Sequence, residues 1–226
     1  FLKDGEGNET PESAYYLCAN RNKRSLTVDL STAEGQAVIR RLAMRSDVLV
    51  ENFKVGDMAR HGLDAATLRA AHPGLVYCSI TGFGQDGPYA QRAGYDFAVQ
   101  GLGGLMSVTG AADGEPQKVG VAVADLFTGM YATVAILAAL RHRDATGEGQ
   151  AIDMALLDAQ VAMLANLGSH YLVGGEVPAR QGNAHANIVP YQVFAVADGH
   201  IIVAVGNDRQ FARLCELLGL AALGQD

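Results

Sequence analysis

The stretch DVLVENFKVGDMARHGLDAATLRAAHPGLVYCSI, residues 47–80, contains two short apolar runs that flank two helical patterns. The runs at 47–52 and 75–80 are rich in Val, Leu, Ile and Tyr, which is typical of buried strands. Between them, the spacing of apolar residues predicts a short helix near 57–61 and a second helix over 64–71. Because a strand, a helical crossover and another strand form a parallel βαβ unit, this stretch predicts an α/β fold.

The preceding residues continue the same alternation. SLTVDL, residues 25–30, is interpreted as a further strand, and the sequence after it predicts a helix over 31–44. Ser31 is the expected N-cap of that helix, and Glu34 completes a capping box. Repeated alternation predicts a parallel sheet with helices on its faces, and in such sheets ligands bind at the carboxyl ends of the strands.

The sequence after the βαβ stretch carries further elements of the same kind. Residues 81–110 are rich in glycine and aromatic side chains, and we interpret them as active-site loops. A long helix is expected near 120–143, followed by a strand and a helix within GEGQAIDMALLDAQVAMLAN, residues 147–166. These elements add a strand to the predicted parallel sheet.

The C-terminal part of the sequence has a different pattern. From about residue 172 we expect a crossing segment without regular structure. YQVFAVADGHIIVAVGN then predicts a hairpin that turns at Asp198–Gly199, and Asn207 is the expected cap of a last helix. This pattern indicates the start of a second domain.

Composition argues against several classes of function. The 226 residues carry 17 Lys and Arg against 24 Asp and Glu, a formal net charge of −7, whereas a nucleic-acid binder needs concentrated positive charge. Three widely spaced cysteines indicate neither disulfides nor a metal site, which favours a cytoplasmic location. The opening residues carry no targeting pattern and no initiator Met, so we do not expect Phe1 to be the biological start.

The longest apolar run, residues 119–140, approaches the length of a membrane span. Asp125 and two glycines interrupt the run. We therefore expect a buried helix of a soluble protein and no membrane partner.

Four blocks of the sequence carry a resemblance to a known family: NRNKRSLTVDL, DVLVENFKVG, YCSITGFGQDGPYAQRAGYDF and TGEGQAIDMALLDAQ. In order and spacing they resemble the family III CoA-transferases. The resemblance implies a Rossmann-like large domain, a smaller α+β second domain, and two chains interlocked as a homodimer. On that pattern, residues 1–172 form the large CoA-binding domain without its first strand, and residues 173–226 form the crossing segment and the start of the small domain. The fold is thus expected to be incomplete at both ends.

Asp158, in LLDAQ, matches the position where the resemblance implies the nucleophilic aspartate. A carboxylate can attack an acyl-CoA thioester to give a mixed anhydride; CoA then forms an aspartyl-CoA thioester, and an incoming acid reverses these steps. Without the resemblance, the residues favour a carboxylate that stabilises the first turn of a helix. Asp125 and Asp153 are interpreted as structural, because Asp125 lies in the long helix and Asp153 alternates along a strand.

CoA requires cations for its phosphates, and NRNKR supplies Arg21, Lys23 and Arg24 in an otherwise acidic chain. A solvated run of surface charge is the alternative interpretation. The resemblance implies CoA contacts at further positions, several of them at predicted strand ends: Val28, Asp29, Leu30, Ser31, Asn52, Phe53, Lys54, Arg60, Tyr95 and Asp96. We therefore expect a CoA thioester as substrate and no permanently bound cofactor.

The acyl group is expected to be dicarboxylic, with succinyl-CoA as a donor, because several blocks look most similar to relatives of that kind. A distal carboxylate calls for a cationic or amide-rich pocket, for which Arg180, Asn183 and His185 are candidates. Ala93 stands where oxalate-handling relatives have lysine, which argues against oxalate chemistry.

Two other functions remain open. A racemase related to the α-methylacyl-CoA racemases would need an acid/base pair. Such enzymes carry histidine at the position of Tyr95 and glutamate at that of Asp158, so both residues favour CoA transfer. The second alternative is a catalytically silent CoA-binding protein.

Overall fold

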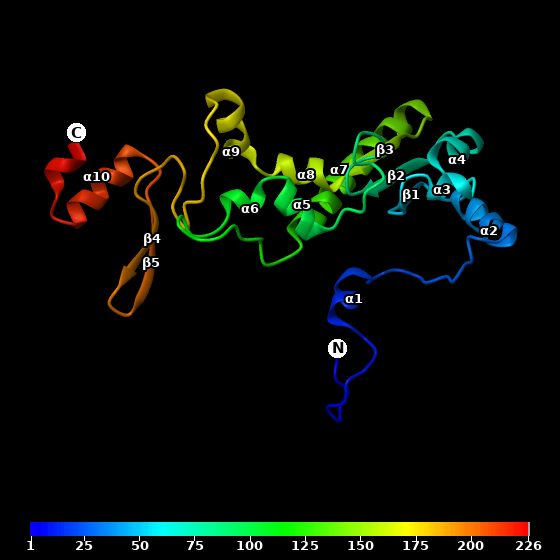
Figure 1. The fold of residues 1–226 in the computed structure, drawn as a ribbon, viewed down its shortest axis with the longest axis horizontal. Helices are drawn as coiled ribbons and strands as arrows, with labels where there is room; N and C mark the ends of the chain where they lie inside the picture. Colours follow the sequence, from blue (N-terminus) through cyan, green and yellow to red (C-terminus); the bar gives the residue numbers. More distant parts are fainter. Residues whose placement is uncertain (226) are drawn as a thin grey trace.

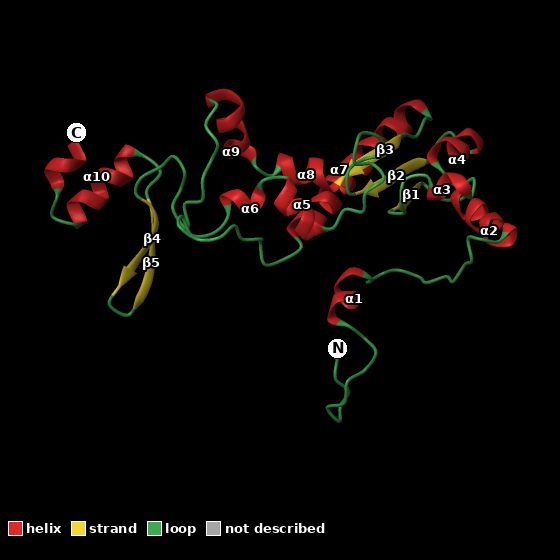
Figure 2. Ribbon diagram, in the orientation of Figure 1, coloured by secondary structure: helices red, strands yellow, loops and turns green. Residues whose placement is uncertain are grey.

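The two apolar runs of the βαβ stretch form adjacent parallel strands, as predicted. β1 (Val48–Glu51) pairs with β2 (Val76–Thr81), with Leu49 opposite Tyr77. β3 (Ala151–Ala155) adds to the other side of β2, so the sheet order is β1-β2-β3 and all pairs are parallel. The computed structural model describes residues 1–225, and Figures 1 and 2 show this sheet within a set of helices.

Within residues 1–225, seven helices precede or connect the strands of this sheet. They are α1 (Ala14–Ala19), α2 (Ala33–Ala43), α3 (Asp57–Arg60), α4 (Ala65–Ala71), α5 (Asp96–Leu102), α6 (Leu105–Val108) and α7 (Val123–Thr146). Four of them, α2, α3, α4 and α7, were predicted from the sequence. Two more short helices and a π-helical turn follow β3: α8 (Leu156–Ala162), α9 (Ala165–Ser169) and η1 (His170–Gly174). Residues 81–110 are therefore not only loops, since α5 and α6 lie within them.

Helices cover both faces of the sheet. Successive side chains of a strand point to opposite faces, so Tyr77 and Ile80 of β2 contact different sets of helices. On one face, Tyr77 packs with buried residues of α2, α3 and α4 and donates its hydroxyl to the carbonyl oxygen of Leu63 at 3.0 Å. Burial raises the pKa of the Tyr77 hydroxyl, and the charges of Glu51 and Asp64 add to this effect. On the other face, Ile80 packs against a cluster contributed by α5, α7 and α8. The fold class predicted from the sequence is confirmed.

The N-terminal segment differs from the prediction. Residues 25–30 form no strand, because the extended chain here pairs with no neighbour, and Figure 1 shows it crossing from α1 to α2 apart from the sheet. The N-cap of α2 is Thr32, whose hydroxyl accepts the N–H of Gly35 at 3.0 Å. Ser31 does not cap the helix, since its hydroxyl donates to the carboxylate of Asp29 at 2.7 Å.

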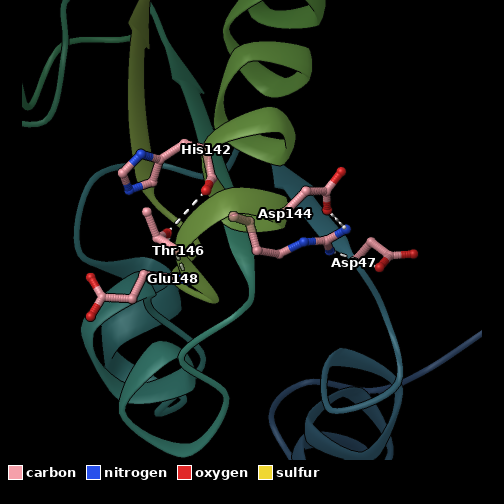
Figure 3. A network of polar contacts seen from close by, with 6 residues as sticks. Asp47, His142, Asp144, Thr146 and Glu148 are labelled. Carbon is pink, nitrogen blue, oxygen red and sulfur yellow. Dashed lines mark hydrogen bonds and ion pairs between the residues drawn. The ribbon is translucent and has the colours of Figure 1, made fainter.

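The C-terminal end of α7 is tied to the start of the sheet by a polar network (Figure 3). Arg143 donates to the carboxylate of Asp47 at 2.7 Å, and Thr146 donates its hydroxyl to the carbonyl oxygen of His142 at 3.0 Å. The N–H of Glu148 donates to the Thr146 hydroxyl at 3.1 Å and so closes the turn that leads into β3. These contacts fix the end of α7 that lies away from the carboxyl ends of the strands.

α7 begins and ends three residues later than predicted, and only one side of it is buried. The buried residues along it are small: Ala124, Thr128, Ala132 and Ala139. Its other side exposes Leu126, Met130, Val134 and Leu137. By length and composition alone, this helix is apolar enough to cross a membrane. The prediction of a buried helix therefore holds for one stripe only.

The C-terminal part forms a hairpin and helices that Figure 1 places at the opposite end of the molecule from α2. β4 (Tyr191–Val196) and β5 (Gly199–Ala204) pair antiparallel, followed by α10 (Asp208–Leu217) and the 3₁₀-helix η2 (Ala221–Gln225). Asn207 caps α10 as predicted, accepting the N–H of Gln210 at 3.0 Å. The hairpin turns at 197–198, one residue earlier than predicted, because Val196 and Gly199 already pair.

Candidate active site

A cavity of about 650 Å³ lies at the carboxyl ends of the parallel strands. Residues 50–55 line it where β1 ends, residues 80–82 where β2 ends, and residues 90–96 on the way into α5. The lining is completed by Asp125, Thr128 and Gly129 from the first two turns of α7 and by Leu156, the first residue of α8. This is the edge of the sheet at which parallel α/β folds bind ligands.

Two glycines hold the segment 90–96 against the end of β2. Gly82 and Gly94 cross so closely that a Cβ on either one would overlap the backbone of the other. The carbonyl oxygen of Gly82 also accepts the N–H of Leu157 at 3.1 Å, which ties the start of α8 to the same point. Glycine is the residue that allows such a backbone approach, so the sequence GFG…RAGYD defines this wall of the cavity.

Asp96 joins α5 to the start of α7. One oxygen of its carboxylate accepts the N–H of Ala124 at 2.8 Å and that of Asp125 at 3.4 Å. The other oxygen accepts from the side-chain amide of Gln100 at 2.7 Å, and the Gln100 amide oxygen accepts the N–H of Val119 at 2.9 Å. Because Gln100 is fully buried, this network fixes the amino-terminal end of α7 beside the cavity.

Asp125 is the carboxylate that α7 contributes to the cavity lining. Although Asp125 is exposed to the solvent in the open cavity, partial burial raises the pKa of this carboxyl, and the negative charge of Asp96 raises it further. Both effects disfavour the ionised form, so the ionised carboxylate is less stabilised by its surroundings than one in water. From the sequence, Asp125 was interpreted as structural; the structure instead places it in the cavity lining, where it is a carboxylate at the start of an apolar helix.

Five of the residues predicted to contact CoA line this cavity. They are Asn52, Phe53, Lys54, Tyr95 and Asp96. The first three follow the end of β1 directly, and the last two form the start of α5. The predicted placement at strand ends therefore brings two separate sequence blocks together.

The other predicted CoA contacts lie outside this cavity. Arg24 is exposed on the N-terminal segment, and Val28 to Ser31 lie just before α2, where the Asp29 carboxylate accepts the N–H of Ser31 at 2.9 Å. Hydrogen bonds from the Ser31 hydroxyl and N–H lower the pKa of Asp29. Arg60 is exposed on α3 and forms an ion pair with Asp57. The structure does not bring this group of residues to the cavity.

Asp158 lies in the first turn of α8, as predicted, but it is not part of the cavity lining. α8 buries Leu156, Ala159 and Gln160. At 100° per residue, Asp158 projects from the opposite side of the helix, and it is exposed. The helix therefore presents Leu156 to the cavity and Asp158 away from it.

The three residues considered for a distal carboxylate also lie elsewhere. The guanidinium of Arg180 donates to three carbonyl oxygens in the 107–114 loop, the nearest being that of Gly114 at 2.7 Å. The ring of His185 packs against Tyr191 and accepts the N–H of Asn187 at 3.0 Å. Arg180 thus holds a loop, and neither it nor Asn183 or His185 lines the cavity.

Two cationic side chains do line the cavity: Lys54, which was predicted, and Arg92, which was not. The guanidinium carbon of Arg92 lies 4.1 Å from the centre of the Tyr89 ring. The sequence signal was an arginine directly before the AGYD block. Within residues 1–225, no three His, Cys, Asp or Glu side chains are grouped so as to hold a metal ion.

The fold is a parallel α/β sheet with a cavity of acidic and cationic side chains at its strand ends, and comparison with known protein families assigns the chain to one of them. The model of CoA-transferase family III matches residues 3–226, and the chain belongs to this family. This confirms the family resemblance that was drawn from the four sequence blocks.

Individual relatives agree with this assignment. The chain is 56% identical over 226 residues to the succinate–glutarate CoA-transferase of Agrobacterium fabrum, covering 100% of this chain and 56% of that protein. It is 46% identical over 212 residues to the human succinyl-CoA:glutarate CoA-transferase, covering 94% of this chain and 48% of that protein. The crystal structure of a CAIB/BAIF family protein from Brucella suis superposes with a TM-score of 0.83 at 53% identity, covering 100% of this chain and 59% of the other. The chain spans about half the length of the curated relatives it matches.

Proposed function

We propose that the full-length protein is a CoA-transferase that moves CoA from a dicarboxylic acyl-CoA, such as succinyl-CoA, to a second carboxylic acid, such as glutarate. The family membership supports the reaction class, and the names of the relatives support the substrates. The observation that carries the proposal for this chain is a carboxylate, Asp125, in a cavity at the strand ends. CoA enters as part of the substrate.

Asp125 is the nucleophile in this proposal. Its ionised carboxylate attacks the thioester carbonyl and expels CoA as a thiolate, which leaves a mixed anhydride between Asp125 and the acyl group. The thiolate then attacks the aspartyl carbonyl, so the first acid leaves and an aspartyl-CoA thioester remains. The second acid attacks this thioester, and the released thiolate attacks the new acyl group, which restores the Asp125 carboxylate. Each step exchanges one acyl bond for another, so no oxidant or reductant is needed.

The surroundings of Asp125 favour this chemistry in two ways. Burial and the neighbouring Asp96 raise the pKa of the carboxyl, and a more basic carboxylate is a stronger nucleophile. Acylation also removes the charge of Asp125, which ends its repulsion with Asp96 and favours the covalent state. The hydrogen bonds of Asp96 to Ala124 and Gln100 keep Asp96 in place through the reaction.

Hydroxylamine trapping distinguishes Asp125 from Asp158, the aspartate predicted from the sequence. Full-length protein incubated with succinyl-CoA and hydroxylamine should carry a hydroxamate on the attacking aspartate. Trypsin places the two candidates on different peptides, 119–141 and 144–180, because cleavage follows Lys118, Arg141, Arg143 and Arg180. A label on 119–141 supports Asp125, whereas a label on Asp158 would restore the sequence prediction.

Matched variants give a second, independent measurement. Asp125→Asn should lower the rate of CoA transfer by at least about three orders of magnitude, as expected when a nucleophile is removed. Asp158→Asn should leave most of the activity, since its side chain lies outside the cavity. The reverse pattern would contradict the assignment, and an inactive wild-type protein would contradict the reaction itself.

Racemisation is less well supported than CoA transfer. It requires an acid/base pair on either side of the α-carbon. Tyr95 lines the cavity where racemases of this family carry histidine, and no histidine is part of the cavity lining among the residues the structure describes. The same cavity argues against a silent CoA-binding protein, because it contains a candidate nucleophile.

We also propose that the protein is a homodimer, in which a second copy covers the exposed side of α7. Leu126, Met130, Val134 and Leu137 form an exposed apolar stripe along this helix, and exposed apolar patches mark protein interaction sites. A stable interlocked dimer should bury well over about 1,600 Å².

A cytoplasmic location is part of the same proposal, supported by three unpaired cysteines, Cys18, Cys78 and Cys215. The division at residue 172 into a large and a small domain remains a prediction.

Sedimentation of the full-length protein at low concentration tests the dimer. The wild type should sediment as a dimer, and Val134→Glu should dissociate it or prevent folding, because it places a charge in the apolar stripe. Arg45→Glu, at an exposed position after α2, is the control that should remain dimeric. A stable monomer of the wild type would overturn the proposed assembly.

A further inference from the structure

Arg92 is held in a defined position at the wall of the cavity. Its guanidinium lies 4.1 Å from the centre of the Tyr89 ring, and the Tyr89 ring packs edge-on against Phe83 with ring centres 5.5 Å apart. The backbone N–H of Arg92 donates to the carbonyl oxygen of Tyr89 at 2.8 Å, which closes a tight turn between them. Stacking on an aromatic ring restricts a long side chain, so this guanidinium loses less freedom when it binds a ligand.

The charge of Arg92 is not used within the protein. The five ion pairs among residues 1–225 do not include it, and its guanidinium donates no hydrogen bond to another residue in this range. Of the three acidic groups that line the cavity, Glu51 accepts the N–H of Phe53 at 2.8 Å and Asp96 caps α7, while the Asp125 carboxylate forms no ion pair with Arg92. The five donors of Arg92 therefore remain available to a ligand in the cavity.

We propose that Arg92 binds the distal carboxylate of the dicarboxylic acyl group and makes the cavity selective for dicarboxylic substrates. The inference rests on the proposed CoA-transferase function. A planar guanidinium matches a carboxylate with two parallel hydrogen bonds, which the single ammonium group of Lys54 cannot do. Arg180 cannot supply this contact in the present structure, since its donors are bound to the 107–114 loop.

The same chemistry would suit a phosphate of CoA, so the experiment must separate the two anions. Butyryl-CoA is the matched ligand, because it has a methyl group where succinyl-CoA has its distal carboxylate and shares the entire CoA part. Free CoA, which lacks any acyl group, reports on the phosphates alone. The variant Arg92→Gln removes the charge and leaves a shorter polar side chain, and Arg45→Gln is the control for an exposed arginine outside the cavity.

Equilibrium binding and kinetics are both measured on full-length protein. In Arg92→Gln, the kcat/KM for succinyl-CoA should fall about 10- to 100-fold, the usual effect of losing a charge-assisted contact. The dissociation constant of succinyl-CoA should rise by a similar factor, while those of butyryl-CoA and free CoA should change less than about threefold. Arg92→Lys should restore part of the lost selectivity, and Arg45→Gln should behave as the wild type.

The outcomes separate this inference from the proposed function. An equal loss for succinyl-CoA, butyryl-CoA and free CoA would assign Arg92 to a CoA phosphate and overturn the inference. Unchanged binding of all three ligands would overturn it as well. A wild-type protein that binds succinyl-CoA but transfers no CoA would refute the proposed reaction, and the binding comparison would still decide the role of Arg92.

Discussion

The carboxylate of Asp96 accepts the backbone N–H of Ala124 at 2.8 Å. It thereby caps the amino-terminal end of α7, in which Asp125 directly follows Ala124. The contact joins two sequence segments 28 residues apart and sets one carboxylate beside another. A single side chain thus has two effects: it fixes the position of the proposed nucleophile, and its charge raises the pKa of that nucleophile.

The first prediction concerns the pH dependence of activity. Asp125 must be ionised to attack, so kcat/KM should fall as the pH drops through its raised pKa. Asp96→Asn keeps a capping oxygen but removes the negative charge, so the pKa of Asp125 should decrease and the acidic limb of the profile should move to lower pH. Burial, the larger cause, remains, so the shift should be partial. An unchanged acidic limb would show that Asp125 does not control it.

Asp96→Ala is the matched comparison for the cap itself. It removes the same charge and also the acceptor for the N–H of Ala124, which Asn keeps; the acceptor for the Gln100 amide is lost in both variants, because Asn has a single side-chain oxygen. Loss of the cap should destabilise the protein by about 1 kcal/mol more than Asp96→Asn, measured as a difference in urea unfolding. Equal stability of the two variants would mean that the cap contributes little.

The second prediction separates stability from activity at Asp125. Because the folded state raises the pKa of this carboxyl, folding favours its proton, and the ionised group costs stability once the pH exceeds the raised pKa. Because Asp125 is exposed and solvent screens its charge, Asp125→Asn should be only slightly more stable than the wild type at pH 7, by about 0.5 kcal/mol or less. The gain should vanish as the pH falls below the ordinary pKa of aspartate. A loss of stability at pH 7 would contradict the burial argument.

The third prediction concerns the core beneath β1 and β2. Tyr77 is buried and donates its hydroxyl to the carbonyl oxygen of Leu63 at 3.0 Å. Tyr77→Phe keeps the ring but leaves that carbonyl without its partner, which should cost about 1 to 2 kcal/mol in unfolding free energy. Chemical denaturation measures the change, and CoA transfer at low denaturant should persist, since Tyr77 does not line the cavity. A loss of activity without a change in the unfolding midpoint would refute a purely structural role of Tyr77.

The three strands of the sheet were predicted correctly because each is a short apolar run between clear helix signals. The apolar residues of β1, β2 and β3 are enough to recognise these strands. Asn207 and Asp64 cap helices as the local rules for N-caps expect. Residues 25–30 have the same apolar character but form no strand, since a strand also needs a partner and composition does not specify one. Pairing is a tertiary property, so this error could not be avoided locally.

The site was predictable in part for the same reason. Asn52 and Tyr95 follow strand ends or loop signals, and the rule for parallel sheets brings them together. Asp125 and Arg92 depend on where α7 starts and on how the turn after Tyr89 is oriented, which only the folded chain reveals. Asp158 has the local context of a reactive carboxylate, but the helical rotation that points it away from the cavity follows from the burial of Ala159 and Gln160.

The last prediction tests the glycine crossing that shapes the cavity wall. Gly82 follows the end of β2, Gly94 precedes α5, and a Cβ on either would overlap backbone atoms of the other. Backbone cannot yield as a flexible side chain does, so Gly82→Ala should move the 90–96 segment or destabilise the fold by about 1 to 3 kcal/mol. Gly120→Ala is the control, because a Cβ there meets nothing within 4 Å. If the wall positions Arg92 and Tyr95, Gly82→Ala should also raise the KM for succinyl-CoA at temperatures where the protein remains folded. A variant as stable and active as the wild type would show that the close crossing is not required for the site.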